Sequence, residues 1–326
     1  MYIEDLRFSL WADFIERDYL DGGFRELIEN GVINGATSNP AIFKNAILTS
    51  SAYKEQLKSL QGLNAKEKYE ALAIYDIQKA ADILKPLYEK GDDGFVSIEV
   101  DPFLCDDAKA TIDEGLRLFR LIARENVMIK IPATKAGYEA MYELSKEGIA
   151  INATLVFSLD QALECAKAFD RANKDSDKRA KKVISVFVSR IDRALDEQLK
   201  ANGVATALSG IYNSAKIYNH IEAMRVSDVR VLFASTGTKD DTLAKHYYIE
   251  KLLAYNSVNT APIETIEAFV KDGKTQKALP IEEKIIDEHF EKIKNCGINF
   301  DTVLDKQISD GLEAFKVAFG EILESL

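Results

Sequence analysis

The sequence predicts an α/β protein, most simply one closed (β/α)8 barrel (a TIM barrel) in a single domain over residues 1–326. Two observations favour this fold: eight short, β-branched, mostly apolar segments, and a stretch with helical spacing after most of them. In addition, no glycine-rich phosphate loop follows any segment, which argues against a doubly wound nucleotide-binding sheet. The predicted strands are residues 8–14, 35–40, 95–101, 127–132, 151–157, 182–189, 229–235 and 257–261.

The segments between the strands carry apolar residues at the three- and four-residue spacing of helices that cover a barrel. Residues 44–93, between the second and third strands, contain two helical patterns, 51–60 and 65–90, where a barrel normally has one. After the last strand, residues 281–296 and 302–326 predict a helical tail. Because no linker rich in Pro, Gly or Ser separates these parts, we interpret them as additions to one barrel. The other predicted helices are residues 24–29, 108–125, 136–147, 159–173, 191–199, 208–224 and 242–253.

The composition excludes several classes of protein. With 53 acidic and 42 basic residues, the net charge of −11 disfavours binding to nucleic acid or anionic membranes. Three cysteines and three histidines, with no CxxC or HExxH, predict reduced thiols and no metal site. There is no signal-peptide pattern and no apolar run near the roughly 20 residues of a membrane helix. We expect a cytoplasmic protein whose chemistry uses Lys, Asp, Glu, Ser and Thr.

The fourth predicted strand carries a lysine where barrel strands are normally apolar. Along VMIKIP, Ile129 and Ile131 point one way and Lys130 points the other, because successive side chains alternate. If the isoleucines pack against helices, Lys130 projects into the barrel, where burial disfavours a charged ammonium. A neutral amine is a nucleophile that can form a Schiff base with a carbonyl. The alternative is a structural lysine paired with a barrel carboxylate.

Neighbouring strands place acids and amides at comparable positions. In FVSIEVD, Ser97, Glu99 and Asp101 share one face, and in FSLWADF, Trp11 and Asp13 do. Carboxylates, an amide and a lysine that converge on one barrel mouth favour acid/base chemistry over a single structural ion pair. Further polar side chains of this set are Thr37 and Asn39 at the end of the second strand and Asn152 and Thr154 on the fifth.

The ends of the sixth and seventh strands suggest a phosphate site. Ser185, Ser189 and Arg190 end the sixth strand, and residues 235–239 (STGTK) follow the seventh, where barrels often bind phosphate. Exposed amides backed by Arg and Lys fit that task, with a plain turn as the alternative. Ser185 and Arg190 differ in strand parity, so they share a site only if the strand ends or bulges between them. We interpret the charged run 173–182 as a solvated loop, with anion binding as the alternative.

These residues together resemble one family, transaldolase, a Schiff-base-forming barrel of the class I aldolase type. Residues 35–43 (GATSNPAIF) resemble its TSNP signature, and residues 127–137 (VMIKIPATKAG) its active-site-lysine segment. SLWADFI, FVSIEVDP, INATLVFS, ISVFVSRID and FASTGTK follow in the family's order, so the likeness covers nearly the whole chain. The arrangement is similar to the single-domain bacterial and plant branch.

The resemblance implies roles for the candidate residues. Lys130 would form the Schiff base, and Asp13 would act as acid and base on the donor's hydroxyl during C–C cleavage. Glu99 and Thr154 would position a water that shuttles protons. Asn39 would hold the dihydroxyacetone unit. The implied substrate-binding residues are Thr37, Asn39, Asn152, Ser185, Arg190, Ser235 and Lys239. Many relatives carry Ser-x-Arg after the seventh strand, whereas here the loop is longer and the cation is Lys239, followed by Asp240.

The resemblance also implies a reaction without metal or cofactor, in the non-oxidative pentose phosphate pathway. Sedoheptulose 7-phosphate and glyceraldehyde 3-phosphate would give erythrose 4-phosphate and fructose 6-phosphate. The expected partners are these sugar phosphates, and a homodimer is a possible assembly. Two alternatives remain open: an aldolase that uses the same lysine but releases free dihydroxyacetone, and a non-catalytic barrel that only binds sugar phosphates.

Overall fold

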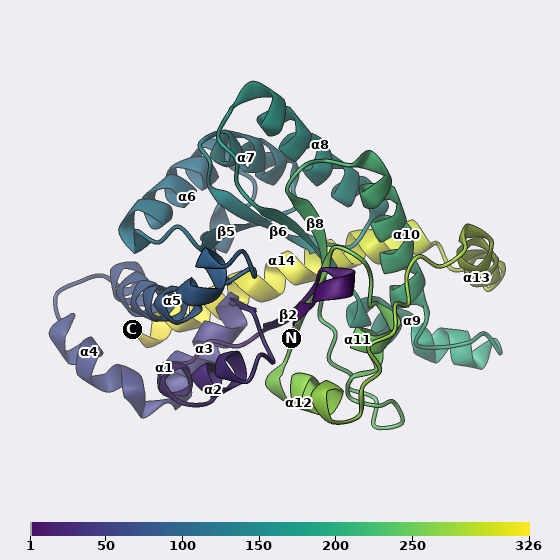
Figure 1. The fold of residues 1–326 in the computed structure, drawn as a ribbon, viewed down its shortest axis with the longest axis horizontal. Helices are drawn as coiled ribbons and strands as arrows, with labels where there is room; N and C mark the ends of the chain where they lie inside the picture. The colour runs from purple at the N-terminus through teal and green to yellow at the C-terminus, as the bar shows by residue number, and fades with distance from the viewer. Residues whose placement is uncertain (1) are drawn as a thin grey trace.

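The computed structural model describes residues 2–326 and contains a closed barrel of eight parallel strands, which confirms the predicted fold (Figure 1). Strands β2 to β9 pair in chain order, and β9 pairs with β2 through registers such as Ser9 with Val258, which closes the barrel. A short strand, β1 (Tyr2–Ile3), pairs antiparallel with β2. The barrel strands are β2 (Phe8–Ala12), β3 (Gly35–Thr37), β4 (Phe95–Glu99), β5 (Val127–Pro132), β6 (Ala150–Val156), β7 (Lys182–Phe187), β8 (Val229–Ala234) and β9 (Ser257–Ala261).

The predicted strands 127–132 and 257–261 have the bounds found in the structure, whereas the other six end one to three residues earlier than predicted. At the end of β3, a polar residue begins a helix instead of extending the sheet. Asn39 accepts a hydrogen bond from the Ile42 amide at 3.0 Å and caps α3 (Pro40–Thr49). Proline at the first position of that helix costs no hydrogen bond, so the residue predicted to end a strand starts a helix.

The helices of the outer ring largely follow the predicted pattern, with four differences. The segment 242–253 is helical only over α11 (Tyr247–Lys251), because Asp240 accepts hydrogen bonds from Thr242 and forms a turn before it. Helices α1 (Arg17–Asp21), α3 and α12 (Ile263–Asp272) were not predicted. The remaining helices are α2 (Gly23–Glu29), α4 (Lys54–Ser59), α5 (Ala65–Glu89), α6 (Ala108–Ile122), α7 (Lys135–Lys146), α8 (Leu159–Asp175), α9 (Ser189–Ala201), α10 (Ser209–Met224), α13 (Glu283–Asn295) and α14 (Phe300–Ser325).

Large side chains fill the barrel interior near its amino-terminal end. Trp11, Phe95 and Met128 belong to one buried cluster inside the barrel, whereas alternate residues such as Leu10 pack in a second cluster against the helices. Gly35 makes room for the indole, because a Cβ atom there would lie 2.6 Å from the Trp11 ring. The alternation predicted from the sequence therefore holds in β2, with Trp11 directed inward.

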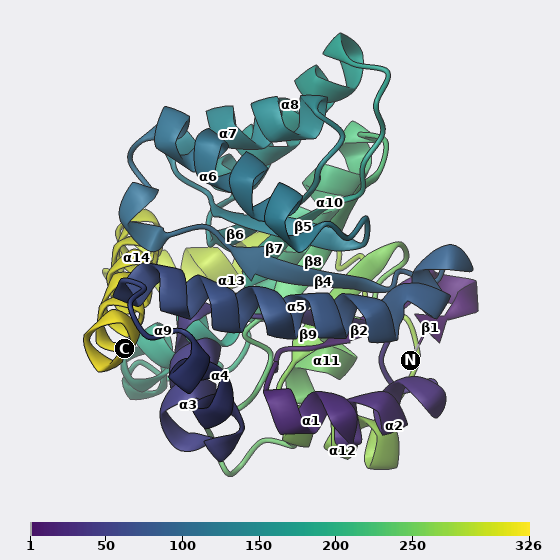
Figure 2. The same cartoon turned by 90° about the vertical axis from the view of Figure 1, so that its left-hand side faces the viewer.

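The C-terminal helix α14 lies across the end of the barrel opposite β1, as the two views agree (Figure 1 and Figure 2). It packs against α3, α5, α9 and the short 3-10 helix at Pro102–Leu104, which connect to the carboxyl ends of the strands or flank them. An edge-to-face contact between Tyr69 and Phe319 and an ion pair between Lys44 and Glu321 fasten it there. The predicted tail is thus not loosely attached but covers the end where barrel active sites lie.

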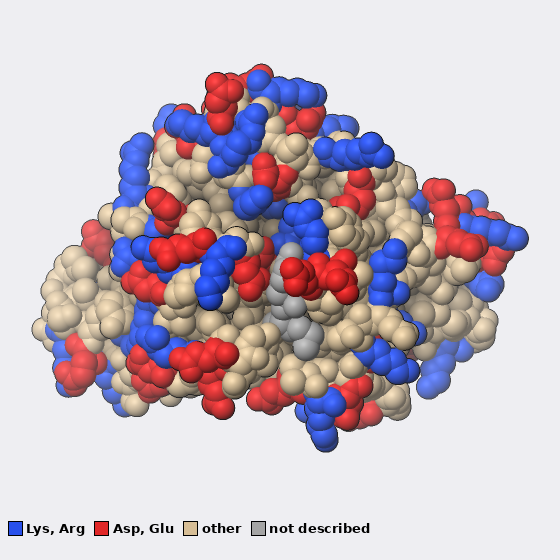
Figure 3. Space-filling view, in the orientation of Figure 1, with Lys and Arg blue, Asp and Glu red and all other residues tan. Residues whose placement is uncertain are grey.

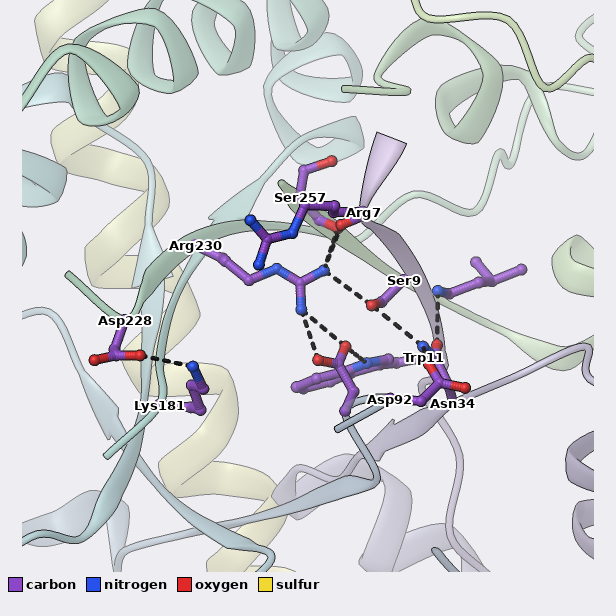
Figure 4. Close-up of polar contacts among 11 residues, drawn as sticks. Arg7, Ser9, Trp11, Asn34, Asp92, Lys181, Asp228, Arg230 and Ser257 are labelled. Atoms are coloured by element: carbon purple, nitrogen blue, oxygen red, sulfur yellow. Dashed lines mark hydrogen bonds and ion pairs between the residues drawn. The ribbon is translucent and has the colours of Figure 1, made fainter. Parts of the chain in front are cut away.

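The opposite end of the barrel is held by Arg230 (Figure 4). One guanidinium nitrogen of Arg230 lies 2.7 and 2.9 Å from the two carboxylate oxygens of Asp93. The other nitrogen donates to Ser9 Oγ and to the backbone carbonyl oxygens of Ser257 and Arg7. Because these partners come from β2, β9 and the segment before β4, one side chain ties together strands that are far apart in sequence. Stability rather than chemistry is the usual role of this face.

We expect Arg230→Met to lower the free energy of unfolding by about 3–5 kcal/mol, because it leaves a largely buried Asp93 without its cation. Lys181→Met is the matched control, since the Lys181–Asp228 ion pair lies nearby but the lysine is 62% exposed (Figure 4). Lys181→Met should lower the free energy of unfolding by less than about 1 kcal/mol. Urea unfolding of both variants tests the expectation, and equal losses would contradict it.

On the face seen in Figure 3, acidic and basic side chains are interspersed, so that face carries no broad surface of one sign. Between residues 2 and 326, no helix combines the length and apolar character needed to cross a bilayer.

Candidate active site

The carboxyl ends of the barrel strands open into a cavity of about 410 Å³. Nine of the eleven candidate residues line it, and the other two, Glu99 and Asn152, lie behind the lining in contact with its members. Residues from all parts of the chain therefore converge as predicted at one barrel mouth. The nine are Asp13, Thr37, Asn39, Lys130, Thr154, Ser185, Arg190, Ser235 and Lys239.

Lys130 projects into the barrel and is 5% exposed. Its direction follows from strand alternation, since Ile129 and Ile131 pack in the outer cluster and Met128 in the inner one. The Lys130 Nζ atom donates to the Ser38 backbone carbonyl at 3.0 Å and lies 3.4 Å from Glu99 Oε2. The lysine thus stands at the bottom of the cavity beside one carboxylate.

Glu99 is the direct cross-strand neighbour of Lys130 and its side chain is 3% exposed. Burial raises the pKa of Glu99 to about 7, although the positive charge of Lys130 opposes the shift. Neither carboxylate oxygen accepts a hydrogen bond from the described residues. A carboxyl group with a pKa near neutrality and unused acceptors is suited to exchange protons at physiological pH.

Asp13 follows β2 directly and faces the same cavity. Its carboxylate accepts a hydrogen bond from Thr37 Oγ1 at 2.7 Å, and Thr37 Oγ1 lies 2.7 Å from Thr260 Oγ1. Because Thr37 has one hydroxyl hydrogen and an ionised Asp13 can only accept, Thr260 must then donate to Thr37. Two hydroxyl groups from β3 and β9 therefore fix the orientation of this carboxylate.

Strand β6 contains an irregularity at the site. The pairing with β7 shifts between Ala153 and Val156, and Leu155 adopts a left-handed φ of 54°. Thr154 lines the cavity, with its hydroxyl lacking a hydrogen-bond partner among the described residues. The bulge also places Leu155 against Gly311 of α14, in the buried cluster that contains Phe315, which the alternating pattern does not predict.

Asn152, predicted as a substrate-binding residue, does not itself line the cavity but contacts Ser185, which does. Its side chain donates to Ser97 Oγ at 3.1 Å and accepts from Ser185 Oγ at 2.6 Å. Asn152 is fully buried and positions Ser185, which does line the cavity. Asp101 departs from prediction: β4 ends at Glu99, and Asp101 turns outward to an ion pair with Lys66 at 2.7 Å.

Four cations lie on one side of the cavity. Strand β7 ends at Phe187 and α9 begins at Ser189, so Ser185 and Arg190 share the site despite their difference in strand parity. Burial and the nearby Arg193 lower the pKa of Arg190. Its guanidinium carbon lies 4.9 Å from the centroid of the Phe187 ring. None of the four forms an ion pair with a described carboxylate, a pattern suited to an anionic ligand. They are Arg190, Arg193, Lys239 and Lys245.

The STGTK loop is part of this site, not an isolated turn. Ser235, Gly237, Thr238 and Lys239 line the cavity, and Ser235 holds a left-handed φ of 55°. Its hydroxyl lies 3.1 Å from Ser189 Oγ, which joins this loop to the start of α9. Some lining residues lacked a clear sequence signal, because their contribution depends on loop and tail packing: Arg193, Lys245, Thr260 and Phe315.

The charged run 173–182 is exposed or half-buried over most of its length, as a solvated loop would be. Lys182 is the exception. It is 1% exposed, and its Nζ atom donates to Asn173 Oδ1 at 2.6 Å. This lysine faces outward from β7 beside Ile184 in the helix-covered layer, so the interpretation of a solvated loop is wrong at this residue.

The raised pKa of Glu99 predicts a pH-dependent stability term. Between about 4.5 and about 7 the folded state holds a proton that the unfolded state loses, so the free energy of unfolding falls as pH rises. Relative to a Glu99→Gln variant, the parent should lose about 3 kcal/mol across this interval. Urea unfolding of both proteins from pH 4.5 to 8 measures the difference, and a constant difference would refute the assigned shift.

Comparison with known proteins agrees with this geometry. The family described as transaldolase/fructose-6-phosphate aldolase matches residues 10–326. A transaldolase of Campylobacter jejuni (strain 81-176) is 48% identical, with 98% of this chain and 99% of the relative covered. A transaldolase of Helicobacter pylori (strain Shi470) is 46% identical with the same coverage. The chain therefore belongs to the transaldolase/fructose-6-phosphate aldolase family.

Proposed function

We propose that this chain is a transaldolase that transfers a dihydroxyacetone unit between sugar phosphates through a Schiff base on Lys130. The observation that carries the proposal is a buried lysine at the base of a cavity, beside Glu99, with four cations on the cavity's side that pair with no described carboxylate. The amine and the cations suit the two ends of a phosphorylated ketose. The full-length relatives named transaldolase support the same assignment.

The first step forms the Schiff base. In its neutral form, Lys130 Nζ attacks the ketone carbon of the donor, and loss of water from the carbinolamine gives an iminium ion. Glu99 and Thr154 present a carboxyl group and a hydroxyl with unused hydrogen-bonding capacity among the described residues. The two residues are therefore suited to hold the water molecule that carries protons to and from the carbinolamine oxygen.

The second step breaks a carbon–carbon bond. Asp13 removes the proton from the C4 hydroxyl, the C3–C4 electron pair moves into the iminium, and an aldose phosphate leaves. The remaining three-carbon enamine stays bound to Lys130 until an acceptor aldose phosphate enters, and the steps then reverse. Asp13 is suited to alternate between base and acid because hydroxyl groups orient its carboxylate. The residue Asn39, which lines the cavity, would hold hydroxyl groups of the bound unit.

Substrate phosphate groups would bind at the cationic side of the cavity. Arg190 can offer a planar pair of donors, while Ser235 and Lys239 extend from the loop after β8. Ser185, held by Asn152, adds a hydroxyl group along the path between lysine and cations. This arrangement supports the expected substrates, sedoheptulose 7-phosphate with glyceraldehyde 3-phosphate, and the products erythrose 4-phosphate and fructose 6-phosphate.

Borohydride reduction in the presence of fructose 6-phosphate tests the proposal. We expect one stable adduct of a three-carbon or six-carbon unit, located on Lys130 by mass spectrometry. Binding of the sugar phosphate without any adduct would instead indicate a non-catalytic barrel. Cleavage at full rate without an acceptor aldehyde would indicate an aldolase that releases dihydroxyacetone.

A further inference from the structure

A side chain of the C-terminal helix closes the cavity above the lysine. Phe315, on α14, is 4% exposed, and its ring centroid lies 5.8 Å from Lys130 Nζ. Within residues 2–326, Phe315 is the one member of the cavity lining that comes from the segment after β9 and α12. The tail therefore brings an apolar ring to the position where a covalent intermediate on the lysine would stand.

Close contacts hold this ring in place. At Gly311, one turn before Phe315, an added Cβ atom would lie 3.0 Å from the Leu155 side chain, so the helix backbone approaches the bulge in β6 closely. One turn after it, Phe319 makes edge-to-face contacts with Tyr69 and Phe103. Because the helix is anchored on both sides of Phe315, the ring is a fixed wall and not a freely moving side chain.

We propose that Phe315 determines whether the enzyme transfers the three-carbon unit or releases it, by excluding water from the enamine on Lys130. This inference rests on the function proposed above. Release differs from transfer in one step, because the enamine takes up a proton instead of adding to an acceptor aldehyde. A proton must first be delivered to the C3 carbon of the enamine, which regenerates an iminium ion, and water must then add to that iminium carbon.

The release reaction is balanced in atoms and electrons without an added oxidant or reductant. The proton that Asp13 takes from the C4 hydroxyl is returned to C3 through water. Addition of water to the iminium and loss of the Lys130 amine then give dihydroxyacetone. The net reaction converts fructose 6-phosphate into dihydroxyacetone and glyceraldehyde 3-phosphate. An apolar ring beside the lysine keeps bulk water, the source of the proton for C3, from the enamine, since its carbon atoms offer no hydrogen bond to replace those of bulk solvent.

The test compares release with transfer in Phe315→Ala. Dihydroxyacetone formation from fructose 6-phosphate is measured without acceptor and divided by the transfer rate measured with erythrose 4-phosphate. We expect this ratio to rise about tenfold or more in Phe315→Ala. Phe315→Leu, which keeps most of the apolar volume, should raise it less. Val317→Ala is the control on the same helix, because Val317 is 49% exposed and lies outside the cavity lining; its ratio should equal that of the parent.

The outcomes separate this inference from the function on which it depends. If the parent forms no borohydride adduct on Lys130, the proposed function itself fails. If the adduct forms in the parent and in a folded Phe315→Ala variant while the ratio stays constant, Phe315 does not control release. Should the alanine variant not fold, Phe315→Val clears space over the amine with a smaller loss of packing, and an unchanged ratio there overturns the inference equally.

Discussion

Lys130→Met is expected to lower the transfer rate by about 10⁴-fold or more, because it removes the nucleophile on which every covalent step depends. Methionine keeps the length and apolar stem of the buried side chain, so the barrel should still fold. No borohydride adduct should form with fructose 6-phosphate. Mass spectrometry of the reduced protein and a coupled assay of transfer measure the two effects.

A second buried lysine provides the matched control. Burial lowers the pKa of Lys182 to about 8, and its side chain is 1% exposed, but it faces the helices and not the cavity. Lys182→Met should therefore retain the adduct and a transfer rate within about threefold of the parent. An adduct that survives in Lys130→Met would exclude Lys130 as the Schiff-base residue. Unfolding of Lys130→Met alone would favour the structural-lysine alternative.

Asp13→Asn is expected to slow C–C cleavage by about 10²–10⁴-fold, the range typical of a lost general acid or base. The amide can still accept the hydrogen bond from Thr37 Oγ1, so the side chain should keep its place. Adduct formation on Lys130 should change much less, because the carboxylate is assigned to the C4 hydroxyl proton and not to carbinolamine formation. Rapid-quench measurement of the adduct and of released glyceraldehyde 3-phosphate separates the two steps.

Asp21→Asn is a control for the loss of one negative charge, because Asp21 is 62% exposed and pairs with Lys79 on the surface. Both steps should proceed in it at the rate of the parent. An equal loss of adduct formation and cleavage in Asp13→Asn would remove the proton-transfer role and leave Asp13 with a role in binding.

The direction of the key side chains could be read from local sequence. In β5, the isoleucines on either side of Lys130 predict its inward direction because neighbouring side chains on a strand must point to opposite faces. The same rule places Trp11 inside the barrel. It fails at Leu155, where a left-handed residue adds a bulge and the side chain packs against α14. A single alternating period contains no information about such an irregularity.

Most of the side chains that line the cavity could also be predicted from the sequence, since polar residues at the ends of parallel strands must meet at one end of a closed barrel. The hydrogen-bond partners of these side chains could not be predicted. Thr260 reaches Thr37 only because β9 closes onto β2. Asn152 is predicted to be a binding residue, and only the pairing of β6 with β7 shows that its side chain lies behind Ser185.

The sequence by itself determined the number and order of the strands, the inward lysine and the family resemblance, because each depends on short-range periodicity or a contiguous motif. Only the tertiary structure decided what stands over that lysine. The periodicity of the tail predicts a helix but not the surface on which it docks, since docking depends on shape and packing against elements far away in the chain. Those contacts set Phe315 across the mouth of the barrel.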